Sequence, residues 1–218
     1  AVDYAAPAAA AEARDRWKSW VFSLSGDGWF SGEETYRSGM INGSFSANRV
    51  TAGSKLRLGL SAGQEKQRYE IDDGEGGVSI ITGKSSNWQA SGMWVKSLGE
   101  HWSAGVYVEA ESSYYANVDM ALRFAPAVEY NFYPYSQSTR RQLRALYTLS
   151  VKPMRYREET VFGKLRETQF KQELSLSLDL REKFGTISVS AEGSNDLRDL
   201  GRYQIDTFGI VNLRLYKG

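Results

Sequence analysis

The segment FKQELSLSLDLREKFGTISVSAEG, residues 170–193, alternates between apolar and polar residues almost without interruption. Leucine occupies every second position from Leu174 to Leu180, and the positions between are polar. Period two is the spacing at which side chains of a β-strand return to the same face, so this pattern predicts strands with one apolar and one polar face. The class of protein then depends on what covers each face: a protein core inside and water outside, or lipid outside and a polar lumen inside.

The same alternation recurs along the chain, and no segment has a convincing helical period. The strand-like segments span 17–31, 34–48, 53–71, 78–97, 101–115, 118–133, 140–156, 165–181, 186–195 and 202–216. Short turns such as SLGEH alternate with longer, more charged loops such as YREETVFGKLRE. This order predicts an all-β fold, an antiparallel up-and-down barrel of about ten strands, and short turns facing longer loops are typical of transmembrane barrels of the outer membrane.

The composition narrows the functional classes. The 27 basic and 26 acidic residues give a net charge of +1, so no nucleic-acid partner is indicated. The absence of cysteine excludes disulfides, thiolate metal sites and thiol catalysis. No apolar run approaches the ~20 residues of a membrane-spanning helix, whereas a transmembrane strand shows lipid only every second residue. Residues 1–16, rich in Ala and without the pattern of a signal peptide, are predicted to be an N-terminal linker before a barrel domain at 17–218.

Binary pattern alone also fits a soluble lipocalin-like barrel, and a β-sandwich less well. Two observations favour lipid. The segments are longer than the ~5–6 residues usual in soluble sheets, and aromatic residues collect near strand ends, where amphipathic rings meet lipid headgroups. Trp88 and Trp94 share a face about 20 Å apart, close to the ~25 Å apolar band of such barrels. The predicted interface aromatics are Trp20, Trp88, Trp94, Trp102, Tyr130, Phe132, Tyr133, Tyr135 and Tyr203.

The polar face mixes small residues with charges of both signs, unlike a solvated surface dense in Lys and Glu. Arg and Glu rows that face each other in a narrow lumen can pair and fill it, and an open pore that selects ions is the alternative. The predicted lumen charges are Lys55, Arg57, Glu109, Glu111, Arg123, Glu129, Arg144, Lys152, Glu173, Asp179, Glu192, Asp206 and Arg214. Pro126 interrupts one strand and removes a backbone donor, so a β-bulge is expected there.

The segments VEYNFYPYSQSTRRQLRALYTLS (128–150) and YREETVFGKLRETQFKQELSLSLDL resemble uncharacterised outer-membrane barrels of Gram-negative bacteria, distantly similar to the salt-induced outer-membrane protein family. The resemblance covers 17–217 and implies fold and location but no reaction. Members of this family carry a further C-terminal hairpin ending in an aromatic residue, so a twelve-stranded barrel is an alternative. They often carry a periplasmic domain before an Ala/Pro linker, which implies a periplasmic partner or domain at the N-terminus.

Few residues indicate chemistry. His101, the only histidine, sits in a short turn with no Ser or Asp placed to form a catalytic pair, so no enzyme activity and no cofactor are predicted. The loop IDDGEGG, residues 71–77, could hold Ca²⁺ but lacks regular ligand spacing, and a solvated hairpin tip is favoured. The segment RYREET (155–160) with Lys164 and Arg166 could contact lipopolysaccharide phosphates, with local salt bridges as the alternative.

The sequence thus predicts an integral outer-membrane barrel of a Gram-negative bacterium, with both termini periplasmic and a largely side-chain-filled lumen. Its expected partners are outer-membrane lipid and lipopolysaccharide, and its expected role is that of an anchor or structural component. A narrow diffusion channel and a soluble ligand-binding barrel stay open as alternatives.

Overall fold

Ten β-strands make up nearly all of the described chain. The computed structural model describes residues 18–51, 53–72, 74, 77–183 and 185–214, and the predicted linker at 1–16 lies outside them. The strands are β1 (Trp20–Gly32), β2 (Tyr36–Val50), β3 (Ser54–Asp72), β4 (Val78–Ser97), β5 (Trp102–Ser113), β6 (Val118–Asn131), β7 (Arg141–Tyr156), β8 (Arg166–Glu182), β9 (Gly185–Asp196) and β10 (Asp199–Leu213), with one 3₁₀ turn, η1 (Tyr135–Gln137), between β6 and β7. Every strand predicted from the sequence is confirmed, with its bounds within three residues.

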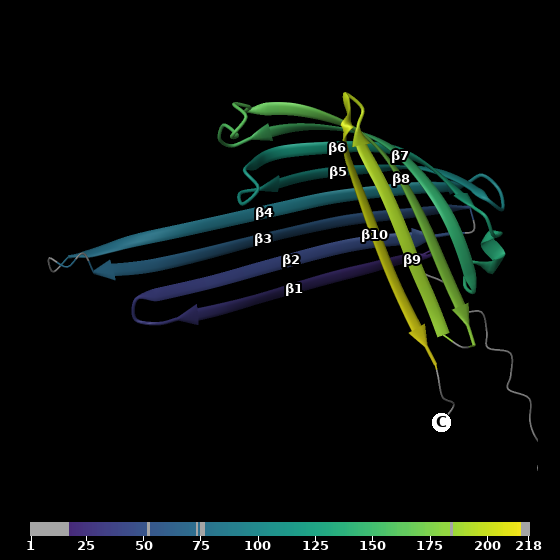
Figure 1. Cartoon of the computed structure of the whole chain (residues 1–218). Helices are drawn as coiled ribbons and strands as arrows, with labels where there is room; N and C mark the ends of the chain where they lie inside the picture. Colours follow the sequence, from purple (N-terminus) through teal and green to yellow (C-terminus); the bar gives the residue numbers. More distant parts are fainter. Residues whose placement is uncertain (1–17, 52, 73, 75–76, 184, 215–218) are drawn as a thin grey trace, which may run out of the picture.

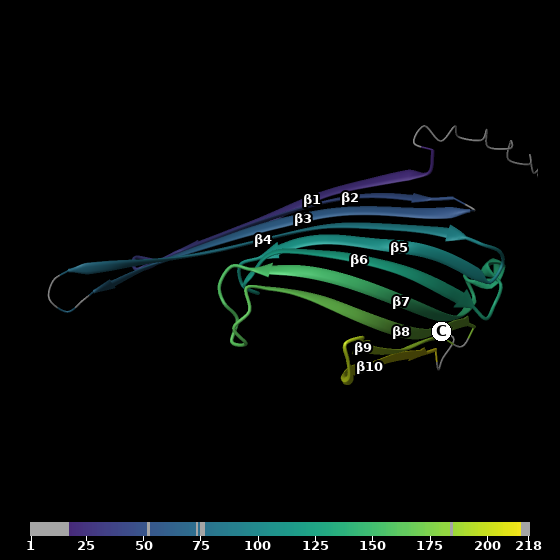
Figure 2. The same ribbon diagram turned by 90° about the horizontal axis from the view of Figure 1, so that it is seen from above.

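Each strand pairs antiparallel with the next, in a single sheet of order β1 to β10 (Figure 1). The predicted all-β, up-and-down topology is therefore confirmed. The sheet curls into a trough whose two rims are β1 and β10 (Figure 2), and among the described residues these two edge strands do not pair with each other. None of the described residues belongs to a helix of the length and hydropathy that a membrane crossing needs.

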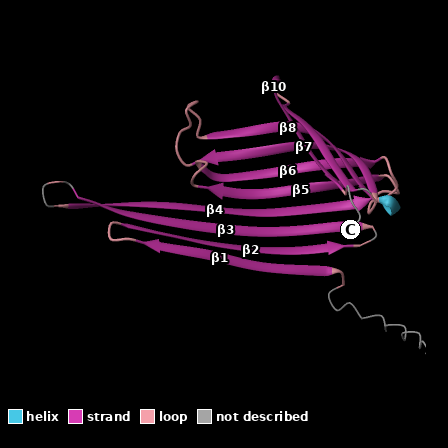
Figure 3. Cartoon of the chain, turned by 60° about the horizontal axis from the view of Figure 1, so that its bottom comes forward, coloured by secondary structure: helices cyan, strands magenta, loops and turns pink. Residues whose placement is uncertain are grey.

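The β3–β4 hairpin projects beyond the rest of the sheet at the loop end (Figure 3). β4 pairs with β5 only over residues 87–97, whereas it pairs with β3 along its whole length from Val78. Residues 78–86 therefore have a neighbouring strand on one side only. β2 accompanies β3 as far as Tyr69, so the projecting part is a small sheet of its own.

The registers assign every strand residue to a face, because directly paired residues of antiparallel strands point the same way. We call one side the apolar face; its residues include Phe45, Leu60, Ala90, Val108, Leu122, Val151, Leu174, Ala191 and Ile205. The other side is the polar face. The leucines from Leu174 to Leu180, which alternation assigned to one side of a strand, share the apolar face.

The polar face is the crowded, concave side of the trough. On β6, Ala125 of the polar face is 0% exposed, whereas its neighbour Phe124 on the apolar face is 52% exposed. Ala121 and Ala127, also on the polar face, are buried as well. Side chains converge on the inside of a curved sheet and spread apart on its outside, so small residues inside are covered while large ones outside are not.

The expected bulge at Pro126 is wrong. Val106 pairs with Pro126 in unbroken register, and the register shifts on either side of β6 lie near its loop end, between Glu111 and Ser113 and between Val118 and Met120. Pro126 points to the apolar face. The missing N–H therefore costs one ladder hydrogen bond without displacing the strand.

Candidate functional site

The polar face carries all of the predicted lumen charges that lie in strands. The registers place the following residues on it: Lys55, Arg57, Glu109, Glu111, Arg123, Glu129, Arg144, Lys152, Glu173, Asp179, Glu192 and Asp206. Arg214 directly follows the last residue of β10. These residues line a lumen only if the sheet closes on itself.

Three ion pairs join β5, β6 and β7 across this face. Lys152 Nζ of β7 lies 2.7 Å from Glu111 Oε1 of β5, and therefore spans the whole of β6. Glu111 is directly paired with Ala121 of β6, which is 1% exposed, and the register between β6 and β7 sets Lys152 opposite Arg123, two residues away. An alanine beside Glu111 leaves room for the lysine side chain to reach it. Small residues on the polar face therefore allow ion pairs to form across a strand.

The other two pairs lie further toward the short-turn end. Arg123 Nη1 is 3.5 Å from Glu109 Oε1, its direct cross-strand partner. Arg144 Nη1 lies 3.7 Å from Glu129 Oε2, and Arg144 Nε donates to Ser177 Oγ at 3.0 Å. Their side chains are partly exposed, so each pair alone adds little stability, and the row acts mainly by filling space.

The remaining charges are separated by sign between the two walls of the trough. Lys55 and Arg57 lie on β3, near one rim. The acids lie on β8, β9 and β10, near the other rim; they are Glu173, Asp179, Glu192 and Asp206. Among the described residues none of these six forms an ion pair.

The predicted interface aromatics of the strands lie on the apolar face. Trp20, Trp94, Trp102 and Tyr130 stand toward the short-turn end, and Trp102 and Tyr130 contact each other with ring centroids 4.8 Å apart. The others are distributed as follows: Phe132 just after β6, Trp88 and Tyr203 toward the loop end, and Tyr133 and Tyr135 in the β6–β7 connection. Arg141 stacks on Tyr133, with its guanidinium carbon 4.6 Å from the ring centroid.

His101 makes structural contacts that tie its turn to the end of β6. Its Nδ1 lies 2.6 Å from the carbonyl oxygen of Asn131, and its ring stacks on Tyr130. In the IDDGEGG loop, predicted to be a solvated hairpin tip, Asp73 and Glu75 lie outside the described residues, and Asp72 Oδ1 accepts a hydrogen bond from the Gly74 N–H at 2.9 Å. Across the described ranges, no group of three or more His, Asp or Glu residues is arranged to hold a metal ion.

The cations of the β7–β8 loop are largely neutralised by their own neighbours. Arg155 and Arg157 both bind Asp119, and Lys164 Nζ lies 3.1 Å from Glu167 Oε2. Tyr156 Oη donates to Glu167 Oε1 at 2.6 Å. Local salt bridging, the alternative to a phosphate site in this loop, therefore accounts for most of its charge.

A second group of cations, which the sequence analysis did not single out, lies at the loop end of the apolar face. Arg37 of β2, Lys66 and Arg68 of β3, and Lys84 of β4 share this face. No motif marks them, because they come from three different strands and only the strand registers bring them together. We call these four residues the basic patch.

Comparisons with known proteins give little further information. The sequence matches no known protein family model and no curated protein, so the resemblance to the salt-induced family stays a prediction. A solved structure that is similar is the β domain of the Bordetella autotransporter BrkA, with 15% identity, 86% of this chain and 88% of that chain covered, and a TM-score of 0.36. A match at this TM-score assigns neither fold nor function.

Proposed function

We propose that this chain is an integral outer-membrane β-barrel whose lumen is filled by its own side chains, and that it acts as a membrane anchor or structural component. The observation that carries the proposal is the exposed apolar face. Leu24, Ile41 and Ile205 are 83%, 73% and 68% exposed, and they belong to one continuous face over ten strands. Water-soluble monomers rarely expose an apolar surface larger than a few hundred Å², whereas a transmembrane barrel needs one.

The register of the sheet supports closure between β1 and β10. Straight across the strands, Phe22 is level with Phe170 of β8. Gln172, two residues further along β8, is level with Tyr203 of β10. Trp20 at the short-turn end of β1 is therefore level with Tyr203 at the loop end of β10.

A closure in which β10 pairs with β1 at a stagger of twelve residues would set Tyr203 beside Gly32 instead of Trp20. A stagger of about twelve residues over ten strands tilts them by about 40°, within the range of membrane barrels. The same pairing keeps both apolar faces on one side and makes the two edges antiparallel. This geometry supports a ten-stranded closure as the proposal, and the twelve-stranded barrel is the alternative that cross-linking of β1 to β10 distinguishes.

The tilt also fits the thickness of a membrane. At about 40° each strand residue advances about 2.5 Å along the barrel axis. The apolar residues of β1 run from Trp20 to Phe30, which is about 25 Å and equals the usual apolar band. The aromatics at both ends of this band fit the two headgroup levels.

Closure also brings the two charged walls opposite each other. The acids of β8–β10 then face Lys55 and Arg57 of β3 across a narrow lumen. Ten strands enclose little more space than the eight-stranded case, which side chains fill. Together with the β5–β7 ion pairs, these charges favour a filled lumen over an open channel.

The experiment is extraction followed by gel mobility. The proposal predicts that the protein needs detergent to stay in solution and migrates faster when it is not boiled. In planar bilayers the purified protein should give no steady unitary conductance. A protein that is monomeric without detergent would overturn the membrane assignment, and steady unitary steps would overturn the filled lumen in favour of a channel.

A further inference from the structure

The basic patch places like charges directly opposite one another. Lys66 pairs with Lys84 and Arg37 pairs with Arg68, all on the apolar face of the projecting β2–β4 sheet. Like charges at directly opposed positions destabilise a sheet. The four cations therefore form two adjacent rows of like charge, Arg37–Arg68 across β2 and β3 and Lys66–Lys84 across β3 and β4, and the repulsion within each row opposes the pairing of the strands.

Acidic residues of the chain neutralise little of this charge. Arg68 Nη2 lies 2.9 Å from Glu70 Oε1, and Arg68 Nε is shielded from solvent without a hydrogen-bond partner in the described structure. Arg37, Lys66 and Lys84 are exposed and form no ion pair with any described residue. This contrasts with the β7–β8 loop, where Arg155, Arg157 and Lys164 are paired with acids.

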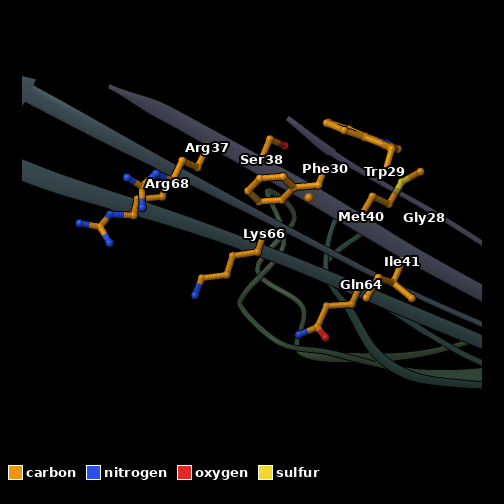
Figure 4. A pocket seen from close by; sticks show the side chains of 11 residues that line it. Gly28, Trp29, Phe30, Arg37, Ser38, Met40, Ile41, Gln64, Lys66 and Arg68 are labelled. Atoms are coloured by element: carbon orange, nitrogen blue, oxygen red, sulfur yellow. The ribbon is translucent and has the colours of Figure 1, made fainter. Parts of the chain in front are cut away.

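The patch adjoins an apolar hollow on the same face. A cavity of about 750 Å³ is lined by Gly28, Phe30, Gly39 and Ile41 on its apolar side and by Arg37 and Lys66 on its basic side (Figure 4). The glycines allow close packing at its floor: a Cβ at Gly39 would lie 3.3 Å from the Phe30 ring, and one at Gly28 3.0 Å from the Met40 carbonyl oxygen, so neither position has room for a larger side chain. The site thus combines cations with a neighbouring groove lined by apolar side chains.

The position of the patch matches the outer headgroup level. On the apolar face of β3 the residues change from Leu60 and Ala62 to Gln64 and then to Lys66 and Arg68. In a barrel with strands tilted by about 40°, Gln64 lies at the same height along the barrel axis as the loop-side end of the apolar band. Lys66 lies about 5 Å further toward the loops. Cations at this level meet lipid phosphates, while Phe30 and Ile41 remain beside acyl chains.

We propose that the basic patch and its groove bind a phosphate-bearing glycolipid of the outer leaflet, with phosphate groups at Lys66, Lys84 and Arg37 and an acyl chain along Phe30 and Ile41. This inference rests on the proposed membrane location and adds a specific lipid site to it. Arg and Lys side chains bind phosphate by charge-assisted hydrogen bonds. A bound anion also removes the repulsion between the opposed lysines, so binding stiffens the projecting hairpin.

The test uses full-length protein in dodecyl maltoside micelles and bisphosphorylated lipid A as the probe, with binding read by native mass spectrometry. K66Q/K84Q should weaken binding about 30-fold, because each cation near a charged surface contributes a factor of about five. The matched control is R49Q/K96Q, which removes two cations from the same face at the short-turn end. It should bind as the unaltered protein does.

Folding and location are measured separately in the same samples. Both variants should keep their heat-modifiable gel mobility, so loss of lipid A binding is separable from failure of the membrane assignment. The proposal is overturned if K66Q/K84Q binds lipid A unchanged, or if R49Q/K96Q loses as much affinity. It is also overturned if inorganic phosphate at the same concentration displaces lipid A, since the acyl groove would then add nothing.

Discussion

Lys152 reaches across an entire strand to place its Nζ 2.7 Å from Glu111 Oε1, whose direct partner on the intervening strand is the buried Ala121. The contact links β7 to β5 without any backbone pairing between them. It is possible because the polar face is concave and because the intervening residue is an alanine. On the polar face, a small residue on β6 therefore accompanies an ion pair between β5 and β7.

Breaking this pair should destabilise the sheet. K152M leaves the half-buried Glu111 carboxylate without its cation and should lower the free energy of unfolding by roughly 1–2 kcal/mol. Urea titration in lipid vesicles measures this. In a double-mutant cycle with E111Q the coupling energy should be about 1 kcal/mol, and a coupling energy of zero would show that the contact is not formed.

A larger residue at the crossing point should have a stronger effect than loss of the charge. A121L places a large side chain directly beside Glu111 and forces the Lys152 ammonium away from it, so both the ion pair and the packing are lost. We expect a cost of about 2–3 kcal/mol, measured in the same titration. In the K152M background the additional cost of A121L should be smaller, whereas full additivity would mean that the two residues do not share the space.

Disulfide cross-linking tests the closure of the sheet. A stagger of twelve places Ser25 beside Ile210 on the polar face, so S25C/I210C should cross-link under mild oxidation. The control S25C/D206C uses the same two strands and the same face but shifts the register by four residues, and it should not cross-link. The chain has no cysteine of its own to interfere. If neither pair cross-links, β1 and β10 are not neighbours, as in a twelve-stranded barrel.

The ordering of the β7–β8 loop should depend on pH through Tyr156 and Glu167. Both residues lie on the loop side of Phe170, the last large apolar residue on the apolar face of β8, and therefore outside the proposed membrane-spanning segments. The hydrogen bond from Tyr156, with help from Lys164 and Gln169, lowers the pKa of Glu167 below its ordinary 4.5. A lowered folded-state pKa means that the stabilisation is present above pH 4.5 and is lost as the pH falls through the folded-state pKa. Hydrogen exchange of residues 157–165 should therefore speed up in acid, and E167Q should abolish that change.

At high pH the contact between Tyr156 and Glu167 should also be lost, this time as the pH rises and Tyr156 ionises. Burial and the Glu167 carboxylate raise the pKa of Tyr156 from 10.0 to about 12. Its contribution is complete below pH 10 and is lost as the pH rises through about 12. Ultraviolet titration of the unaltered protein against Y156F isolates this tyrosine, and ionisation near pH 10 would contradict the contact.

Alternation along the chain was enough to predict the strands, because period two is a local property. The run from Leu174 to Leu180 identifies a strand and its faces without any knowledge of its neighbours. Prediction failed at Pro126, where the sheet accepts a missing donor without a bulge. Local rules describe what proline removes but not how the flanking pairs of β5 and β7 hold the register.

The basic patch lies beyond the reach of sequence reasoning for a different reason. Lys66 and Lys84 are eighteen residues apart, and nothing in either segment says that they stand opposite each other. That depends on the register of the β3–β4 hairpin. The same holds for Lys152 and Glu111, whose contact requires the curvature of the sheet as well as its register.

The most direct measurement of the central claim is a cysteine scan of residues 173–178 in lipid vesicles, with a spin label at each position. The account predicts that labels at the positions of Leu174, Leu176 and Leu178 collide with oxygen dissolved in the bilayer, and that labels at the positions of Glu173, Ser175 and Ser177 are shielded from it. An accessibility that alternates with period two in this phase supports an apolar face against hydrocarbon. Labels on the leucine positions that are shielded from oxygen, or that collide instead with a water-soluble quencher, would contradict it.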